Sequence, residues 1–75
     1  MTLVSISVEF FVDANDEPEE YLDMISYMAW LTYLRENSVR IDSTKHYNPN
    51  TYQYLANYYF YLPEELASFY YLAYG

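Results

Sequence analysis

Residues 3–12 read LVSISVEFFV, and this stretch decides the fold. Its apolar residues alternate with polar ones along most of its length. One parity holds Val4, Ile6, Val8, Phe10 and Val12, and the other holds Ser5, Ser7, Glu9 and Phe11. A period of two, carried by β-branched and aromatic residues, is typical of a strand that is buried on one face. We therefore predict an N-terminal strand over residues 3–12.

An acidic segment follows this strand and predicts a long helix. Asp16 and Glu19 stand three residues apart, as in a capping box, and Pro18 falls in the first turn, where its missing N–H does no harm. Apolar residues then recur at helical spacing over residues 22–34. The pattern predicts one helix over about residues 17–36.

A short second strand and a last helix are predicted further along the chain. Residues 39–42 alternate again, which indicates a strand. Pro63 is followed by two glutamates, and this order is typical of the start of a helix. Aromatic and apolar residues after it predict a helix over about residues 63–73.

The segment between these two elements is ambiguous. Asn48 followed by Pro49 can cap a helix and begin it, so we predict a helix over about residues 49–60. The competing feature is YYFYL at residues 58–62, whose composition favours a strand.

Together these elements predict an α+β fold in a single domain over residues 1–75. It comprises an N-terminal strand, a long acidic helix, a short second strand and two aromatic-rich C-terminal helices. Two strands alone make a marginal sheet. We therefore expect either a third strand at residues 58–62 or pairing of the first strand across a homodimer, and the sequence does not choose between them.

The net charge of −8, from 11 carboxylates and 3 cations, limits the classes of partner. A protein that binds a nucleic-acid backbone needs Lys and Arg to displace counterions, and an anionic membrane attracts basic segments. No apolar run approaches the length of about 20 residues that spans a bilayer. We expect a basic protein partner, with no direct binding to nucleic acid or membrane. The lack of a signal-peptide pattern and of cysteine favours a cytoplasmic protein.

Six acidic residues gather after the first strand and form a candidate partner-binding surface. They are Asp13, Asp16, Glu17, Glu19, Glu20 and Asp23. Four of them recur at helical spacing on one predicted face, and no cation lies near them in the sequence. The simpler interpretation is a solvated helix start that the helix dipole favours. The functional interpretation is an electronegative surface for a cationic groove.

A calcium loop is the next interpretation of this segment. Asp13, Asn15 and Glu17 match the first, third and fifth positions of an EF-hand loop. However, Pro18 replaces the turn glycine, and Met24 replaces the bidentate glutamate. We therefore predict no metal site.

Catalytic chemistry is not predicted either. His46 has no orienting partner in the sequence, and glycine occurs once, at Gly75. That single terminal glycine excludes a phosphate-binding loop, a dinucleotide loop and a nucleophile elbow. We expect a protein that is not an enzyme and that binds no cofactor.

Tyrosine occurs 12 times, and nine of these residues lie between Tyr47 and Tyr74. A small core cannot satisfy so many buried hydroxyl groups. Some rings replace Leu and Phe at the core edge, and others are expected to form a contact patch, because tyrosine is enriched at protein interfaces. We predict Tyr54, Tyr58 and Tyr61 as partner-binding residues.

The acidic cluster and the tyrosine-rich half give the chain a profile that resembles small acidic inhibitors from phages and mobile elements. These include DNA-mimic anti-restriction proteins, glycosylase inhibitors and some anti-CRISPR proteins. Their folds are unrelated, so no residue-level role transfers. The resemblance implies a non-catalytic protein that inhibits a nucleic-acid-binding host protein by occupying its basic groove.

Two other functions fit the same features. The tyrosine-rich half could form the permanent interface of a small structural subunit. Alternatively, the chain could be an acidic adaptor for a basic protein unrelated to nucleic acid. Competition by nucleic acid distinguishes the mimic from the adaptor, and salt-tolerant association identifies the subunit.

Overall fold

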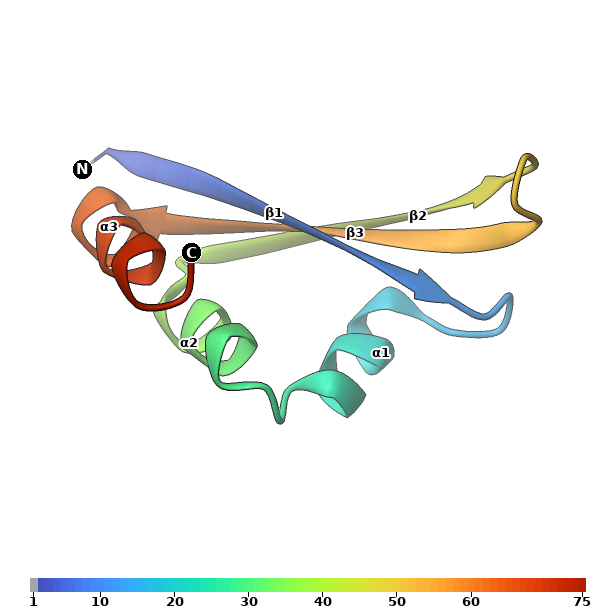
Figure 1. The fold of residues 1–75 in the computed structure, drawn as a ribbon, viewed down its shortest axis with the longest axis horizontal. Helices are drawn as coiled ribbons and strands as arrows, with labels where there is room; N and C mark the ends of the chain where they lie inside the picture. Colours follow the sequence, from blue (N-terminus) through green and yellow to red (C-terminus); the bar gives the residue numbers. More distant parts are fainter. Residues whose placement is uncertain (1) are drawn as a thin grey trace.

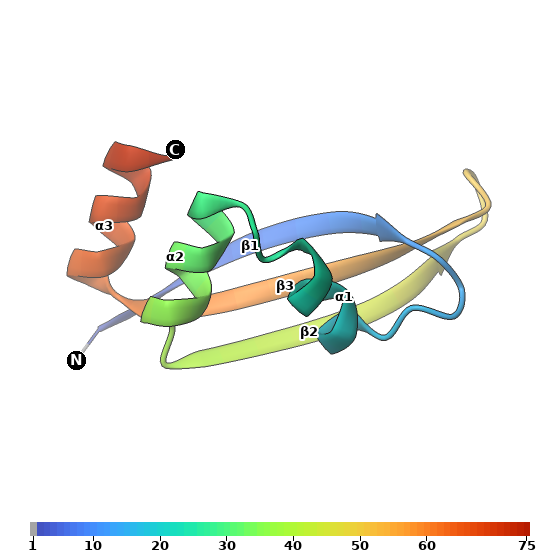
Figure 2. The same cartoon turned by 90° about the horizontal axis from the view of Figure 1, so that it is seen from below.

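A computed structural model describes residues 2–75 and confirms the α+β class (Figures 1 and 2). Within this part of the chain, a three-stranded antiparallel sheet is combined with three helices. The elements are β1 (Leu3–Val12), α1 (Pro18–Ile25), α2 (Ala29–Asn37), β2 (Arg40–Asn48), β3 (Gln53–Pro63) and α3 (Glu64–Ala73). The strand predicted at residues 3–12 is confirmed, and the last helix begins one residue later than predicted.

The last strand of the chain is the central strand of the sheet. The order is β1-β3-β2, and β3 pairs with both neighbours in antiparallel register. Ile6 lies opposite Phe60, and Lys45 lies opposite Ala56. Since β3 supplies the third strand, the sheet within residues 2–75 does not depend on a dimer for its third member.

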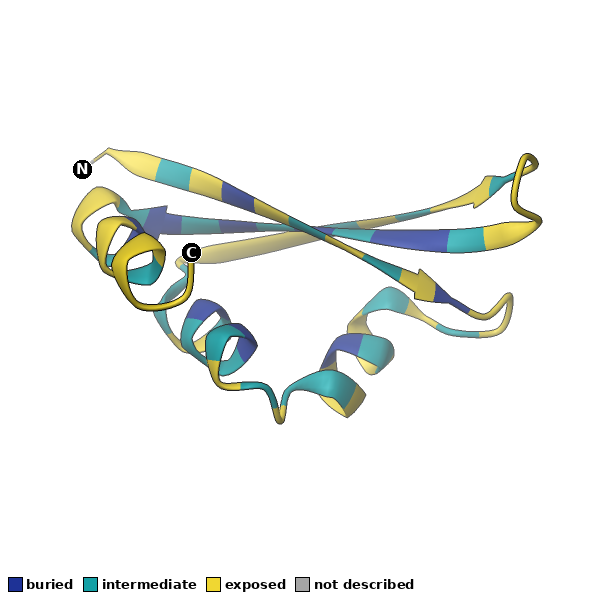
Figure 3. Cartoon of the chain, viewed as in Figure 1, coloured by how far each residue is buried: buried dark blue, intermediate teal, exposed yellow. Residues whose placement is uncertain are grey.

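All three helices lie on one face of the sheet (Figure 1). The even-numbered residues of β3 point to this face, where Tyr58, Phe60 and Leu62 are fully buried. Leu31 and Leu34 of α2 are also fully buried and pack in the same core. Figure 3 shows this pattern as dark segments along β3 and on the sheet-facing sides of α1 and α2.

The prediction of a single helix over residues 17–36 is wrong, because the helix ends at Ile25 and a second helix begins at Ala29. The Ser26 hydroxyl donates to the Leu22 carbonyl, and the Thr32 hydroxyl donates to the Ser26 carbonyl at 2.7 Å. Serine and threonine side chains that bond to nearby backbone compete with the helical ladder. The break separates α1 from α2, so that each helix docks on a different end of the sheet (Figure 2).

The helix predicted over residues 49–60 is also wrong. Asn48 does not cap a helix: its side-chain oxygen accepts a hydrogen bond from the Asn50 N–H at 3.0 Å and forms a turn. The loop ends at Tyr52, whose φ of 56° is the left-handed conformation that often closes a hairpin. The ambiguous segment at residues 58–62 is therefore strand, as its composition indicated.

The second strand is longer than residues 39–42 and extends to Asn48, because it is the first arm of this hairpin. The opposite face of the sheet carries the odd-numbered residues of β3. In the described chain no helix covers this face (Figure 1). Leu55 is buried there between neighbouring strands, yet it does not belong to the main core.

Candidate partner-binding site

The acidic cluster lies on the loop after β1 and on α1, at one end of the molecule. Pro18 is the first residue of α1 and Glu17 is its N-cap, without a side-chain capping bond. Asp16 stays outside the helix, where its carboxylate accepts a hydrogen bond from the Asp13 N–H at 2.8 Å. The predicted capping box from Asp16 to Glu19 is therefore wrong: Asp16 closes the loop instead.

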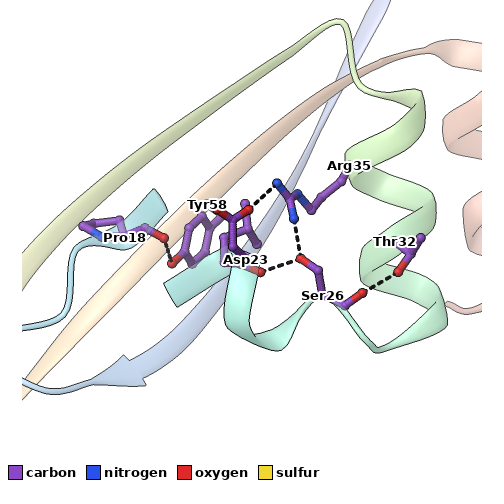
Figure 4. A network of polar contacts seen from close by, with 7 residues as sticks. Pro18, Asp23, Ser26, Thr32, Arg35 and Tyr58 are labelled. Carbon is purple, nitrogen blue, oxygen red and sulfur yellow. Dashed lines mark hydrogen bonds and ion pairs between the residues drawn. The ribbon is translucent and has the colours of Figure 1, made fainter. Parts of the chain in front are cut away.

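The fold brings two cations to the cluster that are distant in the sequence. The Lys45 ammonium donates to the Ala14 and Asp16 carbonyls at 2.7 and 2.5 Å. Arg35 forms an ion pair with Asp23 at 2.7 Å and also donates to the Ser26 hydroxyl (Figure 4). The charge of Asp23 is thus partly neutralised by Arg35. Lys45 ties the acidic loop to β2 through the backbone carbonyls of the loop.

Four members of the cluster remain open to a partner. Asp13, Glu17, Glu19 and Glu20 are exposed, and within residues 2–75 none of them forms an ion pair. Glu19 and Glu20 lie in the first turn of α1, where the helix dipole stabilises negative charge. The part of the predicted surface that can meet a cationic groove is therefore the loop and this first turn.

Tyr58 is not an exposed contact residue, which corrects the sequence-based prediction. Its side chain is fully buried, and its hydroxyl donates to the Pro18 carbonyl at 2.6 Å (Figure 4). Burial raises the pKa of this hydroxyl to about 12, because the charged form loses its solvation. Tyr58 instead ties the start of α1 to the sheet.

The other two predicted tyrosines lie on opposite faces of the sheet. Tyr61 is on the open face, with the Arg40 guanidinium 4.4 Å from the centre of its ring. Tyr54 is on the helical face, where its ring contacts Tyr47 and lies 5.1 Å from the Lys45 ammonium. The structure therefore brings Tyr54, and not Tyr61, to the acidic loop.

A hollow of about 370 Å³ separates the acidic loop from the β2–β3 hairpin. Asp13 and Asp16 line it together with three tyrosines, Tyr21, Tyr52 and Tyr54. Tyr21 and Tyr52 were not predicted from the sequence as site residues. Recognition of the β2–β3 hairpin would have identified them as site residues, because the hairpin brings this part of the chain back to the end of β1.

The lining of this hollow suits a cationic side chain. Carboxylate oxygens attract an ammonium or guanidinium group, and aromatic faces bind such cations through cation–π contacts. Lys45 shows a related arrangement within the chain, since its ammonium contacts backbone carbonyl oxygens, instead of carboxylates, together with the Tyr54 ring.

Within residues 2–75, no group of three His, Asp or Glu side chains is placed to hold a metal ion. His46 is exposed, and its ring nitrogen contacts the Asn57 amide at 3.3 Å. None of the helices formed by the described residues has the length and apolar character that a membrane crossing requires.

No protein-family model matches the chain, and neither a curated protein nor a solved structure matches it at a significant level. The function is therefore inferred from the residues and their geometry.

Proposed function

We propose that the chain is a non-catalytic acidic binding protein that occupies the basic groove of a nucleic-acid-binding protein and so inhibits it. The observation that carries this proposal is the set of exposed carboxylates beside a hollow lined with tyrosines. This is the behaviour of a DNA-mimic, anti-defence inhibitor acting in the cytoplasm of a host cell. The carboxylates replace phosphates, and the tyrosines supply short-range contacts.

The charge density indicates which kind of groove fits best. The charges of the binding surface lie at the acidic end, where neighbours on α1 such as Glu19 and Asp23 stand four residues apart, or one charge per roughly 5–6 Å. Duplex DNA carries one charge per about 1.7 Å, and a single strand carries one per about 3.4 Å. The density is closer to that of a single strand, so a groove that holds one strand is the preferred target.

The hollow suits an arginine or lysine from the wall of that groove. A cation inserted between Asp13 and the tyrosine rings would be partly shielded from water, which strengthens its electrostatic attraction. The carboxylates of α1 would then steer the approach, and the strength of binding would fall with salt.

Charge reversal at α1 tests the proposal. The variant Glu17→Lys/Glu19→Lys/Glu20→Lys changes exposed residues and spares the structural contacts of Asp16 and Asp23. Nucleic-acid-binding proteins retained from a bacterial lysate by the unmodified chain should be released by single-stranded oligonucleotide. The variant should bind them at least about a hundredfold more weakly.

The matched control reverses charge at the other end of the molecule. Glu64→Lys/Glu65→Lys changes two exposed carboxylates in the first turn of α3 and carries a similar dipole cost. It should retain binding. If both variants bind equally well while circular dichroism shows intact folds, the acidic end is not the contact surface and the proposal is wrong.

A second function, a subunit that associates through its tyrosine-rich half, is favoured by the surface of α3. Phe69, Tyr71 and Leu72 are more than half exposed on this helix, at 53%, 54% and 87%. Association through this surface would tolerate salt and would be lost in Leu72→Glu. An acidic adaptor would differ from the mimic because oligonucleotide would not compete for its partner.

A further inference from the structure

The free edge of β1 exposes backbone groups along its whole length. The Glu64 N–H donates to the Thr2 carbonyl at 3.2 Å, so these two residues form a hydrogen-bonded pair across β1 and β3. In an antiparallel ladder such pairs alternate with pairs that point their backbone groups outward. The residues whose N–H and C=O groups point to the free edge are therefore Leu3, Ser5, Ser7, Glu9 and Phe11.

The two edges of the sheet differ in how they are protected. β2 carries Arg40, Asp42 and Lys45 on its edge, and charged side chains discourage the addition of a strand. β1 is ten residues long, contains neither proline nor lysine, and has Glu9 as its charged residue. Such a long apolar edge is a template for another strand.

We propose that β1 pairs with β1 of a second copy of this chain, in antiparallel register centred on Ser7. Residue i then lies opposite residue 14 − i of the partner, so all five outward-pointing residues fall in hydrogen-bonded pairs. The overlap covers residues 3–11, about 30 Å of strand. The two three-stranded sheets become one continuous sheet.

The side chains are complementary in this register. On the open face Leu3 lies opposite Phe11, and both are exposed in the single copy, at 45% and 59%. Ser5 lies opposite Glu9, which gives the carboxylate a hydroxyl donor and keeps the two Glu9 residues apart. Registers centred one residue to either side place Glu9 opposite Leu3 or Phe11 opposite Ser5.

The helical face supports the same arrangement. Val4 lies opposite Phe10 and Ile6 opposite Val8 in this register, so apolar residues meet apolar residues. Figure 2 shows the ends of α2 and α3 reaching past β1 on this face, and a strand added to the edge would lie over them. This pairing does not depend on the proposed function.

A single cysteine tests the register, because the chain has none of its own. Ser7→Cys places the two thiols on the two-fold axis, where Cα atoms of a hydrogen-bonded pair lie about 5.5 Å apart, within the range that a disulfide spans. Mild oxidation should give a covalent dimer rapidly. The matched control, Thr44→Cys, puts an exposed thiol on the open face of the β2 edge strand, the face that carries Ser7, and should form the covalent dimer slowly.

Charge at Ser5 tests the same register without a disulfide. Ser5→Lys sets a cation opposite Glu9 of the partner twice in each dimer, and Ser5→Glu sets a like charge there. Sedimentation equilibrium should show that Ser5→Lys lowers the dissociation constant of the dimer about tenfold and that Ser5→Glu raises it about tenfold. Thr44→Glu, on the open face of β2, should leave it unchanged.

Two results would overturn the proposal. One is an unmodified chain that stays monomeric from nanomolar to millimolar concentration, which would leave the edge free or assign it to an extended peptide from another protein. The other is cross-linking of Ser7→Cys that is no faster than that of Thr44→Cys. Both variants alter an edge position without removing buried apolar side chains, so a loss of folding can be recognised by circular dichroism.

Discussion

The two ends of the molecule are held together by different kinds of interaction. At the end that carries α2 and α3, fully buried Phe60, Leu62 and Leu34 form a continuous apolar core. At the end that carries α1, one residue of that helix, Leu22, is buried. Val12 and Tyr58 extend the same core to this end, and polar contacts supplement it there: the Tyr58 hydroxyl on the Pro18 carbonyl, Lys45 on the loop, and Arg35 on Asp23.

This difference shows how a small protein can keep a charged surface without unfolding. Burial of apolar area supplies most of the folding free energy, so one end can provide stability for the whole domain. The other end is then free to expose carboxylates that repel one another. A few directed hydrogen bonds fix its geometry at modest energetic gain. The candidate site is at the end where polar contacts supplement the apolar packing.

Removal of the Phe60 ring should have the largest effect. Phe60→Ala leaves a cavity in the α2–α3 end and should lower the free energy of unfolding by about 3–5 kcal/mol. Urea denaturation followed by tryptophan fluorescence measures it. Phe69→Ala, at a half-exposed ring, is the control and should change stability by about 0.5 kcal/mol or less. Equal losses in the two variants would contradict the division of the molecule into a packed end and a tethered end.

Loss of the Tyr58 hydroxyl should have the second largest effect. Tyr58→Phe keeps the buried ring but leaves the Pro18 carbonyl without its donor, at a cost of about 1–2 kcal/mol. Denaturation curves should show this loss, whereas Tyr59→Phe, on the open face, should show almost none. Similar losses in both variants would mean that the tether has no special role.

The same hydroxyl predicts a dependence on alkaline pH. In the unfolded chain Tyr58 ionises near its ordinary pKa of 10.0, and in the folded chain near about 12. Between these values the unfolded chain binds fewer protons, so the free energy of unfolding falls as pH rises, by about 3 kcal/mol in total. Below pH 10.0 the hydroxyl is protonated in both states, so its contribution to stability is fully present and does not change with pH. Tyr58→Phe should flatten the alkaline slope, and an unchanged slope would assign it to other tyrosines.

Removal of the Lys45 ammonium should act locally. Lys45→Met keeps an apolar stem beside Tyr54 but removes the donors to the Ala14 and Asp16 carbonyls, with a loss of about 1 kcal/mol. Hydrogen exchange should show faster exchange of the Asp16 amide, while amides of α2 keep their protection. Arg40→Met removes a cation from the open face and should leave the loop unchanged. Uniformly faster exchange would show that the loop is part of the global core.

The Arg35–Asp23 ion pair should contribute least. Its side chains are 34% and 67% exposed, so solvent weakens the attraction. Arg35→Gln should lower the free energy of unfolding by less than about 1 kcal/mol, and the difference should shrink as salt is added. Thermal unfolding at low and high salt measures this. A large loss that salt does not change would point to the Ser26 hydrogen bond instead.

The fold could be predicted where apolar residues follow a regular pattern within one segment and mark a single buried face. β1 alternates between apolar and polar residues, and its bounds agree with the structure. β3 hides its period because aromatic residues point to both faces: Tyr58 and Phe60 inward, Tyr59 and Tyr61 outward. Helix capping and turn formation also use the same residue types, so Asn48 could be read either way.

The candidate site could be predicted in part for similar reasons. The acidic cluster is contiguous, so its members are visible along the sequence. The two cations that contact the cluster are not visible in this way, because Arg35 on α2 and Lys45 on β2 are distant in sequence and approach it only in the folded chain. The separation of Tyr54 from Tyr61 depends on strand parity, which the predicted helix did not allow.

The central position of β3 also has a consequence for the order of events during synthesis. β1 is made first, but its partner lies about fifty residues later, which at 5–20 residues per second is a delay of roughly 3–10 s. The β2–β3 hairpin, by contrast, pairs neighbours and can close in microseconds. We expect β1 to dock last, so substitutions in β2 should slow folding in stopped-flow experiments more than those in β1. During that delay an apolar strand has no partner in its own chain, and chaperones have time to bind it.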